Sequence, residues 1–359
     1  MRGSAAERSA WIVGLAGLIG CAVAWGLTPL QLPFAWLAAV TCFLAWPLGS
    51  LALLFIHALT GGRWGYAIRP QLAAGIATLP LLIPALLPLP FVAQRLYPWM
   101  QPQIAAHLDN RFYLNPPFFY GRAVFYLAVW LVLGLLATRA VRRADPQPAL
   151  EKLAPAALIL LCLTVTFAAI DSTLSLDPQF KSSIYGLLVC VEAVLFALSI
   201  AVLGVTCTSG LPQATTADAA VTRVLGRVLL ALVVLWAYLD FMQFLIIWNS
   251  NLPDEAGWYV HRLEGGWAPL AIGIAVLHFG LPLLALLWPP VQRSRTAIGA
   301  IAALLVVIEI PRAWWIVIPA SGRGIGWADA TTMLALLGLA AGLALRALRC
   351  APREARTHG

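Results

Sequence analysis

The chain has 359 residues, of which 61% are hydrophobic and 11% are charged, and its mean hydropathy is +0.86. Soluble globular proteins carry about 25% charged residues. This composition excludes a cytosolic enzyme, a disordered protein and a secreted disulfide scaffold, and it predicts a protein embedded in lipid. The net charge of +8 does not indicate nucleic-acid binding, because the arginines lie in short segments between apolar runs, where they report membrane topology.

Apolar segments long enough to cross a bilayer recur along the whole chain. A spanning helix needs about 20 apolar residues. The sequence predicts an all-α polytopic membrane protein of about ten transmembrane helices, with residues 1–359 forming a single integral membrane domain. The predicted spans, in chain order, are 10–27, 33–58, 70–93, 118–139, 153–172, 182–206, 224–248, 267–288, 296–318 and 331–348.

Two of these spans carry additional signals. The third, 70–93, contains four prolines, so we expect it to be kinked and packed inside the bundle, where neighbours bond the freed carbonyl groups. The first contains Leu18-Ile19-Gly20-Cys21, which has the pattern of a lipoprotein cleavage box. The residues after Cys21 continue apolar, which favours an uncleaved first helix and leaves lipidation of Cys21 open.

The distribution of lysine and arginine indicates the orientation. With the N-terminus in the cytoplasm, sixteen basic residues fall on the inner side and six on the outer side. Cytoplasmic loops carry an excess of basic residues, so we expect ten spans with both termini cytoplasmic. The longest loops then face outwards: 94–117, 173–181, 249–266 and 319–330.

The outer loops are rich in aromatic residues, proline and asparagine, which predicts ordered segments. Such loops suit docking of an extramembrane partner, notably at 94–117 and 249–266. The alternative is that they only cap the ends of helices. The sequence contains no motif of soluble enzyme chemistry, and its six cysteines show no metal-binding spacing. Paired histidines at matched depth are also lacking, so we expect no haem in this chain.

Ionisable residues inside predicted spans carry the most functional information, because each costs on the order of 2.5–3.5 kcal/mol to insert. Counting from the helix ends places them between the bilayer centre and the outer face, as expected of an outward proton path of carboxyl and imidazole groups. The candidates for this path are Glu192, Asp240, Gln243, His278, Glu309 and Asp171.

Each candidate also has a purely structural interpretation. Glu309 and Arg312 are spaced i,i+3, which predicts an intramembrane ion pair, although Pro311 disturbs the local hydrogen bonding. Asp240 and Gln243 share one face of a helix and could hold helices together. Glu192 is expected to be protonated or paired with another helix. A lone histidine such as His278 is more often a packing residue than a ligand.

Several segments resemble one family of membrane subunits. They are SLALLFIHALTGGRWG (50–65), YLNPPFFYGRAVFYLAVW (113–130), FAAIDSTLSLDPQFKSSIYG (167–186), WAYLDFMQFLIIWNSNLPDEAGWYVHRLEGGW (236–267), LHFGLPLLALL (277–287) and WWIVIP (314–319). In this order they resemble the ActF subunit of alternative complex III, a bacterial quinol:electron-acceptor oxidoreductase. That subunit belongs to the NrfD-like group of membrane proteins.

The resemblance implies two four-helix bundles with two flanking helices, in the bacterial cytoplasmic membrane. It implies a cofactor-free, non-catalytic subunit that supports assembly and conducts protons towards the outer face. It also implies a paralogous NrfD-like membrane partner, and outer partner subunits that carry haem c and iron–sulfur clusters and dock on the outer loops.

Two other functions fit the residues less well. A stand-alone secondary transporter is favoured only by the proline-rich third span, and the internal repeats that transporters often show are not evident. A membrane enzyme acting on a lipid-linked substrate needs acids and bases at one membrane face. The only such group is the charged segment 254–264, which a solvated loop explains more simply.

Overall fold

The computed structural model describes residues 4–108, 110–207, 216–250 and 252–350. Within these ranges, ten helical segments are long and apolar enough to cross a membrane, which confirms an all-α polytopic membrane protein. Side chains such as Ile19, Val124 and Leu284 are about 70% exposed on the outer surface of the helices, where they contact lipid. The ten segments are α1 (Ala5–Leu27), α2 (Leu32–Thr60), α3 (Arg63–Ile76) with α4 (Leu82–Leu86), α7 (Pro116–Val141), α8 (Gln147–Ser172), α9 (Tyr185–Cys207), α10 (Thr216–Ser250), α12 (Trp267–Ile274) with α13 (Leu281–Leu287), α15 (Arg295–Val317) and α16 (Trp327–Cys350).

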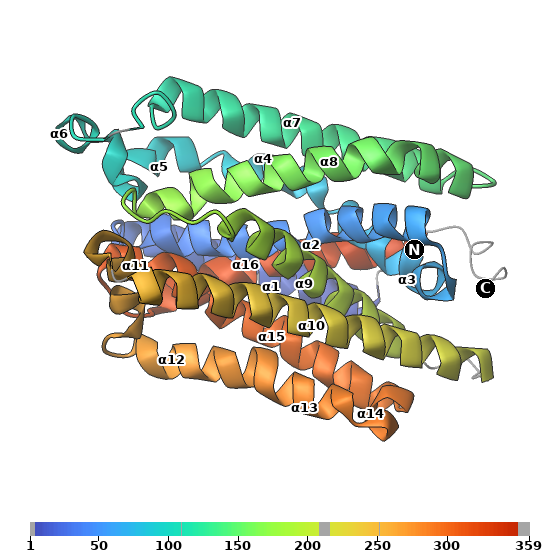
Figure 1. Ribbon diagram of the computed structural model, residues 1–359. Helices are drawn as coiled ribbons and strands as arrows, with labels where there is room; N and C mark the ends of the chain where they lie inside the picture. Colours follow the sequence, from blue (N-terminus) through green and yellow to red (C-terminus); the bar gives the residue numbers. More distant parts are fainter. Residues whose placement is uncertain (1–3, 109, 208–215, 251, 351–359) are drawn as a thin grey trace.

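Short helices cap the two ends of the assembly (Figure 1). One end, called the α6–α11 end below, carries α5 (Leu89–Leu96), α6 (Pro102–Ala105) and α11 (Pro253–Leu263). The other, called the terminal end, carries α14 (Pro289–Arg293), the start of α1 and the end of α16. There, Arg349 near the end of α16 forms a 3.1 Å ion pair with Glu7 in the first turn of α1. An even number of spans places the termini on one side, as the sequence predicts.

The third span differs from its predicted range of 70–93. It begins at Arg63, and its α-helix ends at Ile76, before a 3-10 turn at Leu79–Leu81 and the short helix α4. The prolines at 80, 84, 88 and 90 remove backbone donors and so divide the segment into short pieces. The carbonyl of Ala85, near the end of α4, accepts a 2.8 Å hydrogen bond from Trp36 Nε1 of α2. The expected break is therefore present, within a span that lies closer to the N-terminus.

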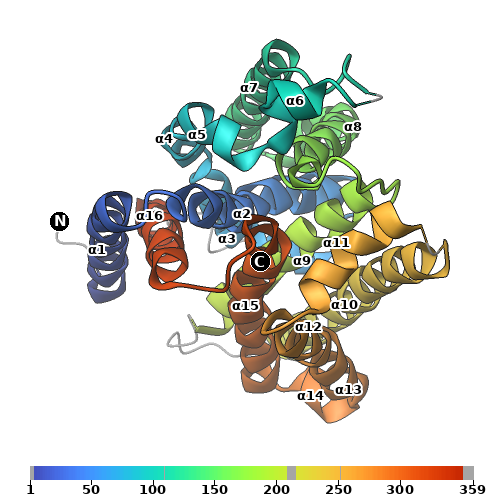
Figure 2. The ribbon, with the colours of Figure 1, turned by 90° about the vertical axis from the view of Figure 1, so that its left-hand side faces the viewer.

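Viewed from the α6–α11 end, the spans form two groups (Figure 2). The first contains α2, α3 with α4, α7 and α8, and the second contains α9, α10, α12 with α13, and α15. The groups meet mainly where α2 packs on α9: a Cβ atom added at Gly49 would lie 1.9 Å from the carbonyl oxygen of Ala193. Glycine therefore lets the two backbones approach at this junction. The helices α1 and α16 form a pair at one side.

The α1–α16 pair is held by a seam of small residues. A Cβ added at Gly17 would lie 2.3 Å from the backbone nitrogen of Ala335, and one added at Gly338 would lie 2.6 Å from that of Gly14. Small residues let helix backbones pack closely in lipid, where apolar side chains gain little by leaving lipid tails for a neighbouring helix. Outside this seam, α1 makes few contacts with the rest of the chain.

Gly17→Leu is expected to separate α1 from α16. The new side chain meets backbone atoms that cannot move aside, and overpacking of this kind costs about 1–3 kcal/mol or more. Thermal unfolding of the detergent-purified chain measures the loss. Gly26→Leu, on the same helix with open space around its Cβ, is the matched control and should leave the midpoint unchanged. Equal midpoints for both variants would show that the seam does not hold α1.

Candidate functional site: a buried charge cluster

An ion pair between two helices lies at the centre of the second group. Arg312 of α15 is 2% exposed, and its guanidinium donates a hydrogen bond to the carboxylate of Glu192 on α9. Its Cζ atom also lies 5.0 Å from the ring centre of Trp236 on α10, which adds a cation–π contact. The arginine thus joins three helices. Glu192 is paired with another helix, in agreement with one of the two states expected from the sequence.

The predicted ion pair between Glu309 and Arg312 is replaced by this contact. Both residues lie on α15 at the expected i,i+3 spacing, but the guanidinium reaches across to Glu192, which would otherwise be a buried carboxylate without a cation. The carboxylate of Glu309 lies instead 3.7 Å from Nε2 of His278. Glu309 remains close to Arg312 and Glu192 in electrostatic terms. The charges therefore form a shared cluster rather than an isolated local pair.

His278 is placed by a break in its helix. The segment Ala275–Gly280 between α12 and α13 is a π-helical turn, a feature that often marks functional sites. The imidazole is 1% exposed, and its ring meets that of Trp236 edge-on with the ring centres 4.1 Å apart. Four spans thus contribute to what we call the buried charge cluster, defined by Glu192, Trp236, Asp240, His278, Glu309 and Arg312.

The buried charge cluster has spare hydrogen-bonding capacity. Nδ1 of His278, Nε of Arg312 and Nε1 of Trp236 are buried and have no hydrogen-bond partner among the described residues. Buried polar atoms are normally satisfied, so three such atoms in one cluster form an exception that calls for a functional explanation. Each can donate to a water molecule, and the neutral imidazole can also accept, which is the chemistry of a proton relay.

Asp240 and Gln243 extend the cluster along α10 towards the α6–α11 end. Asp240 lies one turn beyond Trp236 and within electrostatic range of Arg312 and Glu192, and it has no ion-pair partner among the described residues. Gln243 is 3% exposed, accepts a 2.7 Å hydrogen bond from Ser182 Oγ, and donates one of 3.2 Å to the hydroxyl of Tyr259 in α11. Polar groups therefore continue from Asp240 to α11.

Arg262 is a second buried cation, and it holds α11 in place next to α10. Arg262 donates hydrogen bonds of 3.0 Å to the carbonyl of Trp258 and 2.6 Å to that of Ile316, and Trp315 Nε1 donates one of 3.1 Å to the carbonyl of Arg262. Burial lowers the pKa of Arg262 to about 10, so the side chain stays protonated at neutral pH. Burial likewise raises the pKa of Tyr259, so its hydroxyl remains neutral.

Asp171 belongs to a separate polar cluster in the first group of helices. Its carboxylate accepts two 2.8 Å hydrogen bonds from Arg122 and one of 2.9 Å from the hydroxyl of Tyr126. Arg122 also donates to the carbonyl of Tyr113 at 3.0 Å and lies over the rings of Tyr113 and Phe118. None of these contacts reaches the buried charge cluster. The structure thus separates Asp171 from the other predicted path residues, because Arg122 on α7 satisfies its carboxylate.

Asp171→Asn is expected to loosen residues 98–114 and to lower stability by about 1.5–3 kcal/mol, since it removes charge-assisted hydrogen bonds and leaves Arg122 without its counterion. Limited proteolysis of this segment, together with thermal unfolding of the purified chain, measures both effects. Arg111→Gln is the control, because Arg111 is exposed and its side chain donates to the carbonyl of Leu108 within its own loop. Unchanged proteolysis in Asp171→Asn contradicts the assignment.

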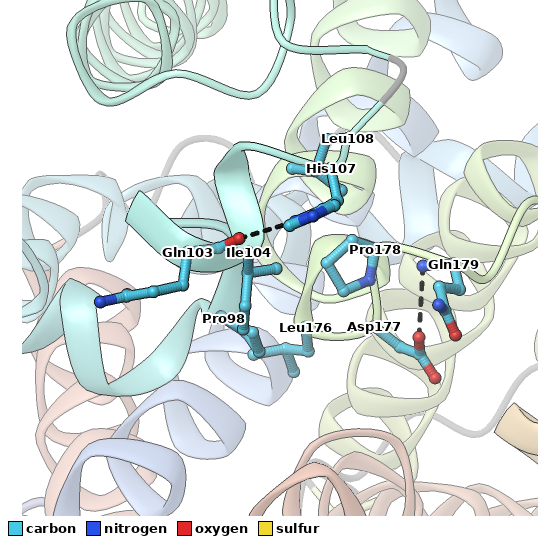
Figure 3. Close-up of a pocket in the computed structure, with 9 residues that line it drawn as sticks. All are labelled: Pro98, Gln103, Ile104, His107, Leu108, Leu176, Asp177, Pro178 and Gln179. Carbon is cyan, nitrogen blue, oxygen red and sulfur yellow. Dashed lines mark hydrogen bonds between the residues drawn. The ribbon is translucent and has the colours of Figure 1, made fainter. Parts of the chain in front are cut away.

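The surface at the α6–α11 end is hollowed beside α6 and α11. A depression of about 450 Å³ lies between α6 and the segment after α8, where His107, Asp177 and Gln179 line it (Figure 3). A second, of about 920 Å³, is lined by Asp177, His261, Glu264 and Arg323, among others. Leu176 and Asp177 line both, so the two depressions adjoin. The surface between the loops predicted for docking is therefore concave and of mixed charge.

The structure brings five of the six predicted path residues into one connected region and leaves Asp171 outside it. Sequence reasoning missed Trp236 and Tyr259, because aromatic residues are frequent throughout the chain and do not distinguish a site. It also missed the pairing of Arg312 with Glu192, which nothing in the local spacing indicates.

Comparison with known proteins does not extend these observations. No protein-family model matches the sequence, and no curated protein is significantly similar to it.

Proposed function

We propose that this chain is a cofactor-free membrane subunit of a respiratory quinol:electron-acceptor oxidoreductase, similar to the ActF subunit of alternative complex III. In this role it supports assembly and conducts protons through the second bundle towards the α6–α11 end. The observation that carries the proton role is the buried charge cluster, because ionisable groups inside a membrane are costly and mark ion or proton pathways.

The balance of charge in the cluster supports proton binding. Arg312 is the one permanent cation, whereas Glu192, Glu309 and Asp240 are three carboxyl groups and His278 is an imidazole. A net charge is expensive in a medium of low dielectric constant, so one ionised carboxylate balances Arg312. The remaining groups then hold protons that can pass among them. Glu309 and His278, whose polar atoms lie 3.7 Å apart, form the natural pair for this exchange.

The contacts beyond the cluster supply an exit. Asp240, Gln243 and Tyr259 follow one another from α10 to α11, and Ser182 joins them from the segment before α9. Side-chain oxygens and amides of this kind order water, and water completes proton paths between groups that are too far apart for direct transfer. The exit leads to the end that the basic residues assign to the outer face, which leaves both termini in the cytoplasm of a bacterial cell.

The α6–α11 end supports the docking role. Its segments are held by buried hydrogen bonds, as at Arg262 and Arg122, and it presents two adjoining depressions. A rigid, concave and mixed-charge surface suits a folded partner. We place the outer partner subunits, which carry haem c and iron–sulfur clusters, over loops 94–117 and 249–266. We place the paralogous membrane subunit beside the lipid-exposed helices.

Affinity purification of the tagged chain in mild detergent, followed by mass spectrometry of every co-purifying polypeptide, tests this proposal. The expected result is a set containing multihaem and iron–sulfur subunits and a second ten-span protein. A lone protein without redox partners overturns the complex and leaves a secondary transporter, favoured by the broken third span, or an enzyme acting on a lipid-linked substrate. Transport assays in liposomes then separate those two.

A further inference from the structure

Four arginines gather at the terminal end of the second bundle. Arg223 and Arg227 lie one turn apart near the start of α10, Arg293 ends α14, and Arg295 begins α15. These helices touch at this point, because a Cβ added at Gly226 would lie 2.9 Å from Cδ1 of Ile298 and 3.6 Å from Cα of Gln292. Residues from separate parts of the sequence are thus brought to one place, which we call the arginine patch.

Local contacts hold the backbone of the arginine patch in position. Gln292 Nε2 donates a 2.6 Å hydrogen bond to the carbonyl of Leu286, which fixes the turn between α13 and α14. Ser294 caps α15 by accepting a 3.2 Å hydrogen bond from the backbone of Ala297. Arg295 donates to the carbonyl of Val205 near the end of α9. The patch is therefore built by the packing of three helices and not by a single helix end.

The positive charge of the patch has no counterpart within the described side chains. Among the described side chains, no carboxylate oxygen lies within 4.0 Å of any of these four guanidinium groups. Arg122, Arg312, Arg323 and Arg349, by contrast, each have a carboxylate within that distance. Like charges one helical turn apart repel. An external anion that bridges the guanidinium groups removes this repulsion and forms charge-assisted hydrogen bonds.

An apolar surface adjoins the patch. Trp288 directly precedes α14 and is 65% exposed, and Leu284 and Leu287 of α13 and Val224 of α10 are also exposed. Tryptophan is typical of the boundary between acyl chains and headgroups. Basic groups at headgroup depth with apolar side chains beside them match a molecule that has an anionic head and acyl tails.

We propose that the arginine patch binds the phosphate headgroup of an anionic phospholipid, whose acyl chains lie along Trp288 and α13. Guanidinium groups bind phosphate oxygens in a bidentate manner, and basic pockets between membrane helices recognise anionic lipids. This site is independent of the proton role, because it lies at the opposite end of the second bundle from the α11 exit.

Native mass spectrometry of the full-length chain, with added phosphatidylglycerol or phosphatidylcholine, tests the proposal. The wild type should retain phosphatidylglycerol selectively. The triple variant Arg223→Gln, Arg227→Gln, Arg293→Gln should bind it about 100-fold more weakly, because each basic group near an anionic headgroup contributes to affinity. Arg295 is left in place because it also contacts α9. Thermal unfolding without added lipid verifies that the variant is folded.

Removal of the same number of charges elsewhere at the terminal end provides the matched control. Arg139→Gln, Arg142→Gln, Arg143→Gln changes three arginines at the end of α7 and should retain wild-type binding. Equal losses in both triple variants would show general attraction to the anionic surface and would overturn a specific site. Displacement of the lipid by inorganic phosphate at equal concentration would assign the patch to a free anion and would also overturn the proposal.

Discussion

Arg312→Met is expected to destabilise the chain by about 3–5 kcal/mol, the cost of leaving a buried carboxylate without its cation. Methionine preserves much of the side-chain volume, so the loss reports the charge rather than a cavity. The free energy of unfolding in mixed detergent micelles, followed by tryptophan fluorescence, is the measurement. The same variant removes the cation–π contact with Trp236, so a change in the fluorescence of the folded state is expected too.

A double-mutant cycle separates the ion pair from other effects. Glu192→Gln alone removes the carboxylate that accepts a hydrogen bond from Arg312 and should be destabilising, whereas the combination of Glu192→Gln with Arg312→Met removes both members of the pair. Replacement of a buried ion pair by neutral groups is often close to neutral for stability, so the double variant should recover most of the loss. A double variant as unstable as the sum of the single variants would show that the two residues do not interact.

Glu309→Gln is expected to lower quinol oxidation by the purified complex by about 100-fold. Glutamine has nearly the same shape but cannot exchange a proton, and a positioned acid–base group typically contributes 10²–10⁴-fold. The Arg312–Glu192 pair is unchanged in this variant, so the chain should still co-purify with its partners. The rate of quinol oxidation, normalised to the haem content of the preparation, measures the effect.

Glu151→Gln is the matched control, since it removes one exposed carboxyl group near the start of α8, away from the buried charge cluster and from the docking surface. It should oxidise quinol at the wild-type rate. If Glu309→Gln and Glu151→Gln oxidise quinol equally fast, the buried charge cluster has no part in turnover. A loss of partners in Glu309→Gln alone would instead assign the residue to assembly.

The sequence predicts the spans well because lipid imposes a simple rule on helix length and composition. Nine of the predicted spans overlap helices of similar extent, and their ends differ from those of the helices by no more than eight residues. The third span begins at Arg63 rather than at residue 70, because Arg63 and Arg69 lie inside its helix. A count of apolar residues instead predicts a loop for the segment that contains these two arginines. Arg69 is accommodated there by a 3.0 Å hydrogen bond to Gln147 of α8, which no local pattern reveals.

The buried charge cluster is less predictable for a physical reason. Its members are recognisable one by one, because charged residues are rare in apolar helices. Their partners are not, because nearly continuous apolar sequence hides which face of each helix is turned inward. Local spacing therefore suggests Glu309 as the partner of Arg312, whereas packing supplies Glu192 from another helix. Asp171 illustrates the same point, since its partner Arg122 lies 49 residues away on α7.

Proton release by the complex in liposomes tests the central proposal most directly. The complex is oriented with the α6–α11 end facing the lumen, quinol is supplied, and the protons released into the lumen per electron are measured with a pH-sensitive dye. We expect release beyond that of quinol oxidation alone in the wild type, and its loss in Asp240→Asn, which blocks the step between the buried charge cluster and α11. Equal release by both proteins would contradict proton conduction through this chain.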